Sequence, residues 1–261
     1  MKPKVKKPAP LRIVVGTNSL TETQYPAYTN HCQFWFRLGR SYPHIEFIFS
    51  NPSRMSIDRM RNMSARVALD TKSDFLLFLD DDVIVNPNYG LQQLLDCSAD
   101  IAAGKINIRG YPFDYMSFTQ VKNKGLIADS KLPKKGILNK DAIGFSFALI
   151  KTSILKKLQE PYFMTGLNHT EDIYFCLKAR QVDPQCTIKV NCECECGHIL
   201  WPEIIHEANR EDYIKYFMRA NNIKKSTAGQ NSSGDRGRNY LTKVKKVLIS
   251  DKKAESRLRV Q

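Results

Sequence analysis

The sequence predicts an α/β protein in which a mostly parallel central sheet is flanked by helices. Over the first 85 residues, strand-like and helix-like segments alternate in the order β-α-β-α-β, as in doubly wound sheets with right-handed crossovers. The third strand, residues 75–79, is an uninterrupted run of Phe and Leu that stops at three consecutive acids. Such a run is typical of a central strand buried on both faces.

The other elements follow from local patterns. Strands are expected at 11–16 and 45–49, and helices at 28–38 and 57–68. After the strand at 75–79 we expect a helix at 89–97, strands at 100–106, 142–151 and 186–196, a helix at 172–180, and a last helix within 206–221. Residues 107–140 are polar with little periodicity, which predicts a long irregular insertion.

Length and charge predict one domain with basic ends. The chain has 261 residues, 42% of them hydrophobic, and a net charge of +14. Residues 1–10 carry +4 and residues 222–261 carry +8, which leaves +2 for residues 11–221. We therefore expect a nearly neutral domain at 11–221 between a basic N-terminal arm at 1–10 and a basic linker and C-terminal tail at 222–261. Such arms either attract polyanions or only aid solubility, and both interpretations stay open.

The sequence also predicts a cytoplasmic protein with reduced thiols. No stretch approaches the ~18 consecutive apolar residues of a membrane span, and the first apolar run is too short for a signal peptide. The seven cysteines lack the paired spacing of a disulfide scaffold. Cys192, Cys194 and Cys196 alternate along an expected strand, where neighbours on one face lie about 6.6 Å apart. They are expected in the core, since three such sulfurs do not easily converge on a zinc ion.

The acids Asp80, Asp81 and Asp82 form the candidate metal site. They follow a buried strand, at the end of the sheet where α/β folds bind ligands. Carboxylates packed this closely repel one another unless a cation is present, and oxygen ligands suit Mg²⁺ or Mn²⁺. A solvated acidic turn is the alternative.

Three features in this order resemble the GT-A fold glycosyltransferases, particularly their family 2-like branch: the acid cluster, Glu171-Asp172 at the start of a helix, and His198 after a late strand. The Arg61-Asn62 pair on the preceding helix is similar to the family pattern as well. Further similar fragments are Gly104 with Arg109 and Pro112, residues 143–151 and residues 170–180. The resemblance covers roughly residues 11–205 and implies a Rossmann-like GT-A domain.

The resemblance implies a metal-dependent and inverting enzyme. It would move a hexosyl or pentosyl group from a nucleotide-diphosphate sugar to an acceptor hydroxyl, with Mn²⁺ or Mg²⁺ neutralising the diphosphate that leaves. Asp82 would bind the metal directly, and Asp80 would bind it through water or lie nearer the donor's ribose. Asp81 is placed with the donor-binding residues. His198 would be a further metal ligand, and a purely structural histidine is the alternative.

The resemblance also assigns the base and the donor contacts. Asp172 would deprotonate the acceptor hydroxyl, and Glu171 would contact a sugar. Alternatively, both acids only stabilise the helix N-terminus, by about 0.3–1 kcal/mol each. Thr17 and Asn18 lie where the family holds the nucleobase and ribose. Arg61 would meet the base or a phosphate, or would be an exposed helix residue.

The basic ends suggest an anionic acceptor. One hypothesis is a hydroxymethylated base in DNA, as in some phage base-modification systems, which requires the base to be flipped out. Aromatic residues of the insertion would then stack on it, or else belong to the core: Tyr111, Phe113, Tyr115 and Phe118. The alternative acceptor is a glycan or a lipid-linked sugar at an anionic membrane surface.

Other classes of protein fit less well. A non-catalytic nucleic-acid-binding module would explain the charge but not the acids after a buried strand. A nucleotidyltransferase ranks lower because Gly16-Thr17-Asn18-Ser19 is not a glycine-rich phosphate loop. A haloacid-type phosphatase is rejected because its paired acids would follow the first strand.

Overall fold

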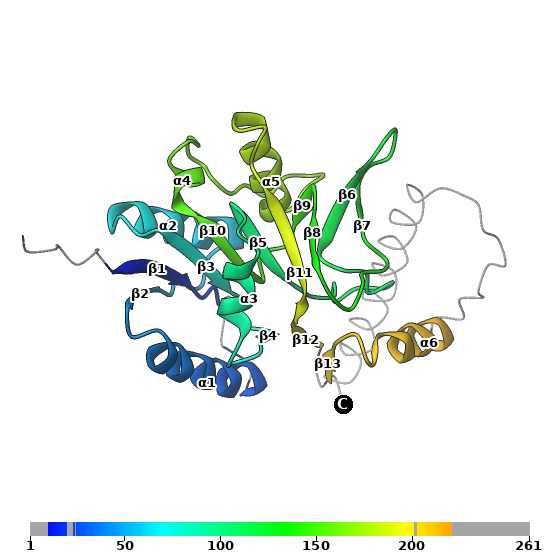
Figure 1. The fold of residues 1–261 in the computed structure, drawn as a ribbon. Helices are drawn as coiled ribbons and strands as arrows, with labels where there is room; N and C mark the ends of the chain where they lie inside the picture. Colours follow the sequence, from blue (N-terminus) through cyan, green and yellow to red (C-terminus); the bar gives the residue numbers. More distant parts are fainter. Residues whose placement is uncertain (1–9, 20–22, 24, 201–202, 221–261) are drawn as a thin grey trace, which may run out of the picture.

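The computed structural model describes residues 10–19, 23, 25–200 and 203–220, so the expected basic arm and tail lie almost wholly outside the described residues. The centre of the fold is a seven-stranded sheet (Figure 1). Its strands run in the order β2 (Ile45–Ser50), β1 (Leu11–Gly16), β3 (Phe75–Leu79), β10 (Phe147–Lys151), β5 (Ile101–Lys105), β11 (Ile188–Glu195) and β8 (Ile137–Asn139). Only β10 and β8 are antiparallel to their neighbours, so the predicted mostly parallel sheet is confirmed.

Helices cover both faces of this sheet. The helices α1 (Tyr25–Ser41) and α3 (Gly90–Asp96) lie on one face, and α2 (Ile57–Asp70), α4 (Thr152–Leu155) and α5 (Glu171–Val182) lie on the other (Figure 1). Alternate strand residues feed two separate cores, because successive side chains of a strand point to opposite faces. Leu76 and Phe78 pack with α2 and α5, whereas Leu77 and Leu79 pack with α1 and α3.

Two small sheets complete the fold. One pairs β4 (Val83–Ile84), β12 (Gly197–Leu200) and β13 (Glu203–Ile205), and the other pairs β7 (Gly125–Ala128), β6 (Ser117–Val121) and β9 (Ala142–Ile143). A last helix, α6, spans Arg210–Ala220. The expectation of an irregular insertion at 107–140 was therefore wrong, since it contains the β6–β7 hairpin and edge strand β8.

The strand expected at 142–151 is divided in two. Its first residues form β9, which pairs with β6, and its last residues form β10, which pairs with β3 and β5. The break at Gly144, Phe145 and Ser146 turns the chain from one sheet into the other. It also places two backbone carbonyls beside the acid turn, as described below.

The cysteine prediction is confirmed. Cys192, Cys194 and Cys196 are buried free thiols, and Cys194 and Cys196 belong to the core under α3. In the part of the chain that the structure describes, no helix has the length and apolarity needed to cross a membrane.

Candidate active site

The three acids form a tight turn at the carboxyl end of β3. The Asp80 amide donates to the Ser146 carbonyl at 2.9 Å, and the Val83 amide donates back to the Asp80 carbonyl at 3.3 Å. Because β3 lies between β1 and β10, the turn projects from the middle of the sheet. All three carboxylates are only partly exposed. The acid turn is therefore held by the framework and is not a freely solvated loop.

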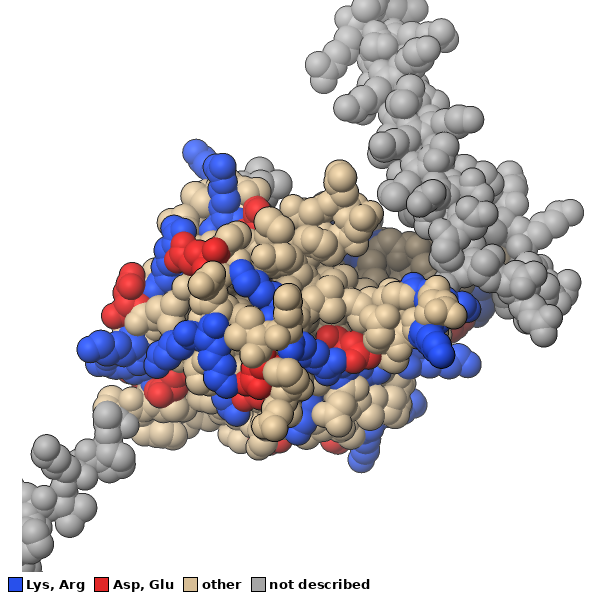
Figure 2. All heavy atoms as spheres, turned by 90° about the horizontal axis from the view of Figure 1, so that it is seen from above, with Lys and Arg blue, Asp and Glu red and all other residues tan. Residues whose placement is uncertain are grey.

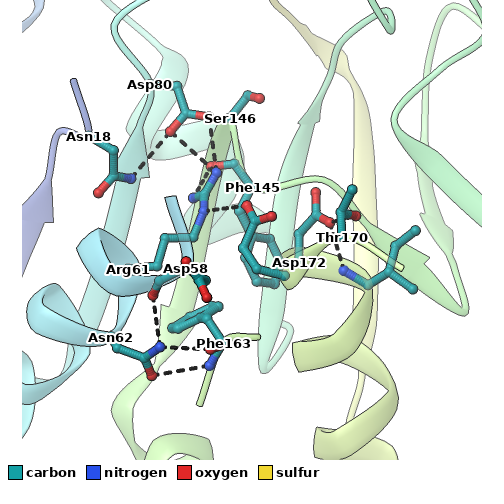
Figure 3. Close-up of polar contacts among 12 residues, drawn as sticks. Asn18, Asp58, Arg61, Asn62, Asp80, Phe145, Ser146, Phe163, Thr170 and Asp172 are labelled. Carbon is teal, nitrogen blue, oxygen red and sulfur yellow. Dashed lines mark hydrogen bonds and ion pairs between the residues drawn. The ribbon is translucent and has the colours of Figure 1, made fainter. Parts of the chain in front are cut away.

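Arg61 joins this turn to the start of α5 (Figure 3). Its Nη2 lies 3.0 Å from Asp80 Oδ2, its Nε donates to Glu171 Oε1 at 2.9 Å, and its Nη1 donates to the Phe145 carbonyl at 3.0 Å. The guanidinium also lies 4.7 Å from the centre of the Phe78 ring. Arg61 is almost completely buried, which excludes the alternative of an exposed helix residue.

The electrostatic balance around Arg61 is negative. Burial alone would lower the pKa of Arg61, but Asp80, Glu171 and Asp172 together raise it, so the guanidinium stays charged. Burial raises the pKa of Glu171 despite Arg61, and burial likewise raises the pKa of Asp172. One cation thus faces three carboxylates in a region with little water. Perturbed acids of this kind gather at functional sites.

Asp172 opens α5 with its two oxygens in different surroundings. Oδ1 accepts hydrogen bonds from the Thr170 hydroxyl and from the Ile173 amide, the latter at 2.7 Å. Oδ2 lies over Gly144, where an added Cβ would be 3.3 Å from it and 2.5 Å from Met116 Cε. Thr170 and Ile173 therefore fix the carboxylate through one oxygen, while the other oxygen faces a position that has space only for glycine.

Asp82 faces a histidine and an arginine. Its Oδ1 is 3.6 Å from His198 Nε2, and its Oδ2 is 2.8 Å from Arg109 Nη1. The antiparallel pairing of β12 with β4 places His198 opposite Val83, next to this acid. Burial would raise the pKa of Asp82, but His198 and the charge of Arg109 outweigh it and lower the pKa.

The Asp82–His198 pair has the chemistry of a divalent-metal site. His198 Nδ1 lies 2.7 Å from the Asn107 carbonyl, and because a carbonyl only accepts, Nδ1 carries the proton. A metal ion would bind Nε2 through its lone pair, and the Asp82 carboxylate lies beside that nitrogen. Such outer hydrogen bonds orient metal-binding histidines, and Mg²⁺-type ions take one or two carboxylates together with water and phosphate. Within the described residues, no third His, Cys, Asp or Glu completes a ligand cluster.

Asp80 does not lie in this pair. Its carboxylate bonds to Arg61 and, through Oδ1, to the side-chain amide of Asn18 at 3.3 Å (Figure 3). Binding of the metal through water stays a prediction for Asp80. Burial, followed by the charges of Asp82 and Asp80, raises the pKa of Asp81, which stays a predicted donor-binding residue.

The predicted donor end lies beside the same turn. Asn18 is buried, and its Oδ1 has no hydrogen-bond partner among the described residues. The Thr17 amide donates to the Ser50 carbonyl at 3.1 Å, which fixes the end of β1 against β2. A buried carbonyl oxygen without a donor is suited to a ligand N–H or O–H group. The contacts of Thr17, Asn18 and Arg61 with a nucleotide-sugar stay predictions.

Two residues that hold the site, His31 and Asn30, were not singled out by the sequence, whereas Asn62 was named there together with Arg61. His31 Nε2 bonds to the Val83 carbonyl at 2.9 Å, and Asn30 exchanges two hydrogen bonds with the backbone of Val85. Asn62 bonds to the backbone of Phe163 and so fixes the loop before α5 (Figure 3). Burial lowers the pKa of His31, which keeps it neutral. No local pattern distinguishes Asn30 and His31 from ordinary helix residues.

The insertion aromatics belong mainly to the core. Phe113 and Tyr115 are buried, and Phe118 is half-buried against the core under α5. Tyr111 stacks on Phe217 of α6, with ring centres 4.9 Å apart. These contacts favour the core alternative over stacking on a nucleic-acid base.

Comparisons with known proteins bear on the fold. No protein-family model matches the chain, and no curated protein matches it. Among solved structures, A197 from STIV is similar over 73% of this chain and 86% of its own, with 18% identity and a TM-score of 0.51. Lower similarities include the inositol-1-phosphate CTP transferase from T. maritima (11% identity, 84% and 98% covered, TM-score 0.40). Another is a glycosyltransferase involved in glycosylation of the major capsid of PBCV-1 (12% identity, 56% of this chain and 63% of that chain covered, TM-score 0.30).

The class of fold follows from these observations. A mostly parallel sheet with one reversed inner strand, and an acid turn at the carboxyl end of its central strand, define a GT-A type fold. The fold class predicted from the sequence is confirmed, and A197 shares it.

Proposed function

We propose that this chain is a metal-dependent glycosyltransferase that moves a sugar from a nucleotide-diphosphate sugar to an acceptor hydroxyl with inversion. The observation that carries the proposal is the chain of contacts at the carboxyl end of the sheet. Asp82 and His198 lie at one end of it, Asp172 lies at the other, and Arg61 joins Asp80 to Glu171 between them. A candidate metal-binding pair and a candidate base thus lie at the same end of the sheet.

Asp82 and His198 are the residues that would hold the divalent ion. When bound, the ion supplies Lewis-acid stabilisation of the diphosphate that leaves. Arg109, next to Asp82, is the protein's own cation at this position and would interact with the same diphosphate. Asn18 Oδ1, which has no partner within the part of the chain that the structure describes, would accept a hydrogen bond from the nucleoside.

Asp172 is the proposed base. Its burial raises its pKa and strengthens its tendency to take a proton, while the bonds from Thr170 and Ile173 keep it oriented. A single displacement by a hydroxyl that Asp172 activates inverts the anomeric centre. Capping alone does not require an acid that is buried among other acids, so the helix-capping alternative leaves this arrangement unexplained.

The acceptor is left out of this proposal. Phe113 and Tyr115, two of the side chains expected to stack on a DNA base, are buried in the protein. Support for a DNA acceptor is therefore limited to the basic ends of the sequence.

A panel of nucleotide-sugars with Mn²⁺ tests the proposal, with thermal shift and slow donor hydrolysis as readouts. We expect one donor class to stabilise the protein only with the metal, and Asp82→Asn to abolish the response. Asp70→Asn, at an exposed position at the end of α2, is the matched control and should respond like the parent. If no nucleotide-sugar gives a metal-dependent response, the proposal is wrong.

A further inference from the structure

One face of α1 carries large apolar side chains that are open to solvent. Tyr25, Tyr28 and Phe36 are 79%, 60% and 64% exposed, and the small Cys32 between them is exposed too. Their spacing of three or four residues places them on one stripe of the helix. Trp35 lies at its border and meets Phe49 of edge strand β2, with ring centres 5.3 Å apart. We call Tyr25, Tyr28, Trp35, Phe36 and Phe49 the aromatic stripe.

The aromatic stripe is separate from the face that α1 packs into the protein. The buried side chains of α1 are Ala27, His31, Phe34 and Leu38. Asn30 and His31 also fasten the helix to the segment after the acid turn. The aromatic stripe is therefore presented by a fixed helix, and of its members on α1 only Trp35, at the border, also packs against the core. Exposed apolar area of this kind, when contiguous, marks an interaction surface.

The charged residues of α1 are all of one sign. The 17 residues of α1 include Arg37 and Arg40 but no Asp or Glu. The N-terminal arm, with four lysines in residues 1–10, enters the fold at Leu11. Leu11 pairs with Ile45, four residues after the end of α1, so the first described strand begins near the C-terminal end of this helix. By contrast, Lys and Arg are intermixed with Asp and Glu on the face shown in Figure 2.

We propose that α1 lies in the interface of an anionic membrane, with the aromatic stripe inserted among the lipids and the arginines at the headgroups. Tyr and Trp favour that depth, and a helix with an apolar stripe and a basic flank binds in the plane of the interface. A second copy fits less well, because a twofold contact would set this basic surface against itself. A nucleic acid fits less well because Arg37 and Arg40 lie beside the stripe and not between its rings.

This proposal does not depend on the proposed catalysis, since binding is measured without donor or metal. The assay is flotation of the full chain with vesicles of phosphatidylcholine alone or mixed equally with phosphatidylglycerol. We expect flotation with the anionic vesicles only. Tyr28→Ser with Phe36→Ser should weaken binding by about tenfold or more, as loss of inserted apolar area requires. Leu177→Ser with Tyr216→Ser, at exposed sites on α5 and α6, is the matched control and should change nothing.

A second measurement keeps the stripe intact. Trp35 is one of two tryptophans, so its fluorescence can be isolated in a Trp201→Phe background. Anionic vesicles with brominated acyl chains should quench Trp35 and shift its emission to the blue. Absence of quenching, or equal loss of flotation in the control variant, overturns the proposal. So does binding to single-stranded DNA, or a concentration-dependent dimer, that Tyr28→Ser with Phe36→Ser abolishes while vesicle binding persists.

Discussion

Replacing Arg109 tests the arrangement at Asp82 most directly. In the metal-free protein, the guanidinium neutralises the carboxylate that is proposed to bind the metal, at 2.8 Å. A divalent ion must therefore compete with Arg109 for Asp82. The Arg109 side chain is half-exposed, so solvent screening limits the ion pair to about 1 kcal/mol. Arg109→Gln removes this competition and should tighten Mn²⁺ binding by roughly fivefold, since 1.4 kcal/mol corresponds to tenfold.

The same substitution should have the opposite effect on the donor. Without its guanidinium, the protein loses a charge-assisted bond to the diphosphate, worth about 1.5–3 kcal/mol. Donor binding in saturating Mn²⁺ should therefore weaken by about tenfold or more. Isothermal titration calorimetry with Mn²⁺ alone, and then with the nucleotide-sugar, measures the gain in metal affinity and the loss of donor affinity in the same variant.

Arg12→Gln is the matched control for these titrations. Arg12 also forms a partly exposed ion pair, with Glu46 at 2.7 Å, but lies at the opposite end of β1 from the site. It should leave both affinities unchanged. Weaker or unchanged Mn²⁺ binding in Arg109→Gln, or the same change in Arg12→Gln, would refute the competition between Arg109 and the metal.

Three further predictions concern the buried network. Arg61→Met leaves buried carboxylates without their cation and should lower the free energy of unfolding by about 3–5 kcal/mol in denaturant titrations. The folded-state pKa of Asp172 is raised, so its contribution to stability is greatest below its unfolded pKa and is lost as pH rises through the folded pKa. For the same reason, the acidic limb of the pH profile of kcat/KM should lie above the usual range of aspartate. Thr170→Val removes a bond to the charged form and should move that limb to still higher pH. Gly144→Ala forces Met116 to shift and should cost about 1–3 kcal/mol of stability, much of it recovered by adding Met116→Ala.

Each of these predictions has its own check. Arg66→Met breaks an exposed ion pair with Glu160 and should leave the free energy of unfolding almost unchanged, so an effect equal to that of Arg61→Met would remove any special role of Arg61. An acidic limb that does not move in Thr170→Val would show that another group is the base. Failure of the Gly144–Met116 double variant to recover would mean that the space over Asp172, and not Met116, sets the requirement for glycine.

The sequence predicted what depends on local patterns. The order of elements and the acids after β3 follow from periodicity and from an abrupt change of residue type. The partners of Arg61 do not: Glu171 lies 110 positions further along the chain, and no spacing connects the two. Arg109 lay in a stretch with little pattern because its neighbouring strands, β6 to β8, are short and largely exposed. The reversed direction of β10 likewise could not be predicted from the sequence, because strand pairing depends on residues far apart in the chain.

The position of β10 has a consequence for how the chain folds. This strand separates β3 from β5, and its approach supplies the carbonyls of Ser146 and Phe145 that bond to the Asp80 amide and to Arg61. The segments up to residue 140 therefore cannot form the continuous sheet by themselves. Contacts of such long sequence separation slow folding. We expect a chain still being synthesised to hold β1, β2 and β3 as an incomplete unit. The acid turn would be fixed only after residues 145–151 have been inserted between β3 and β5.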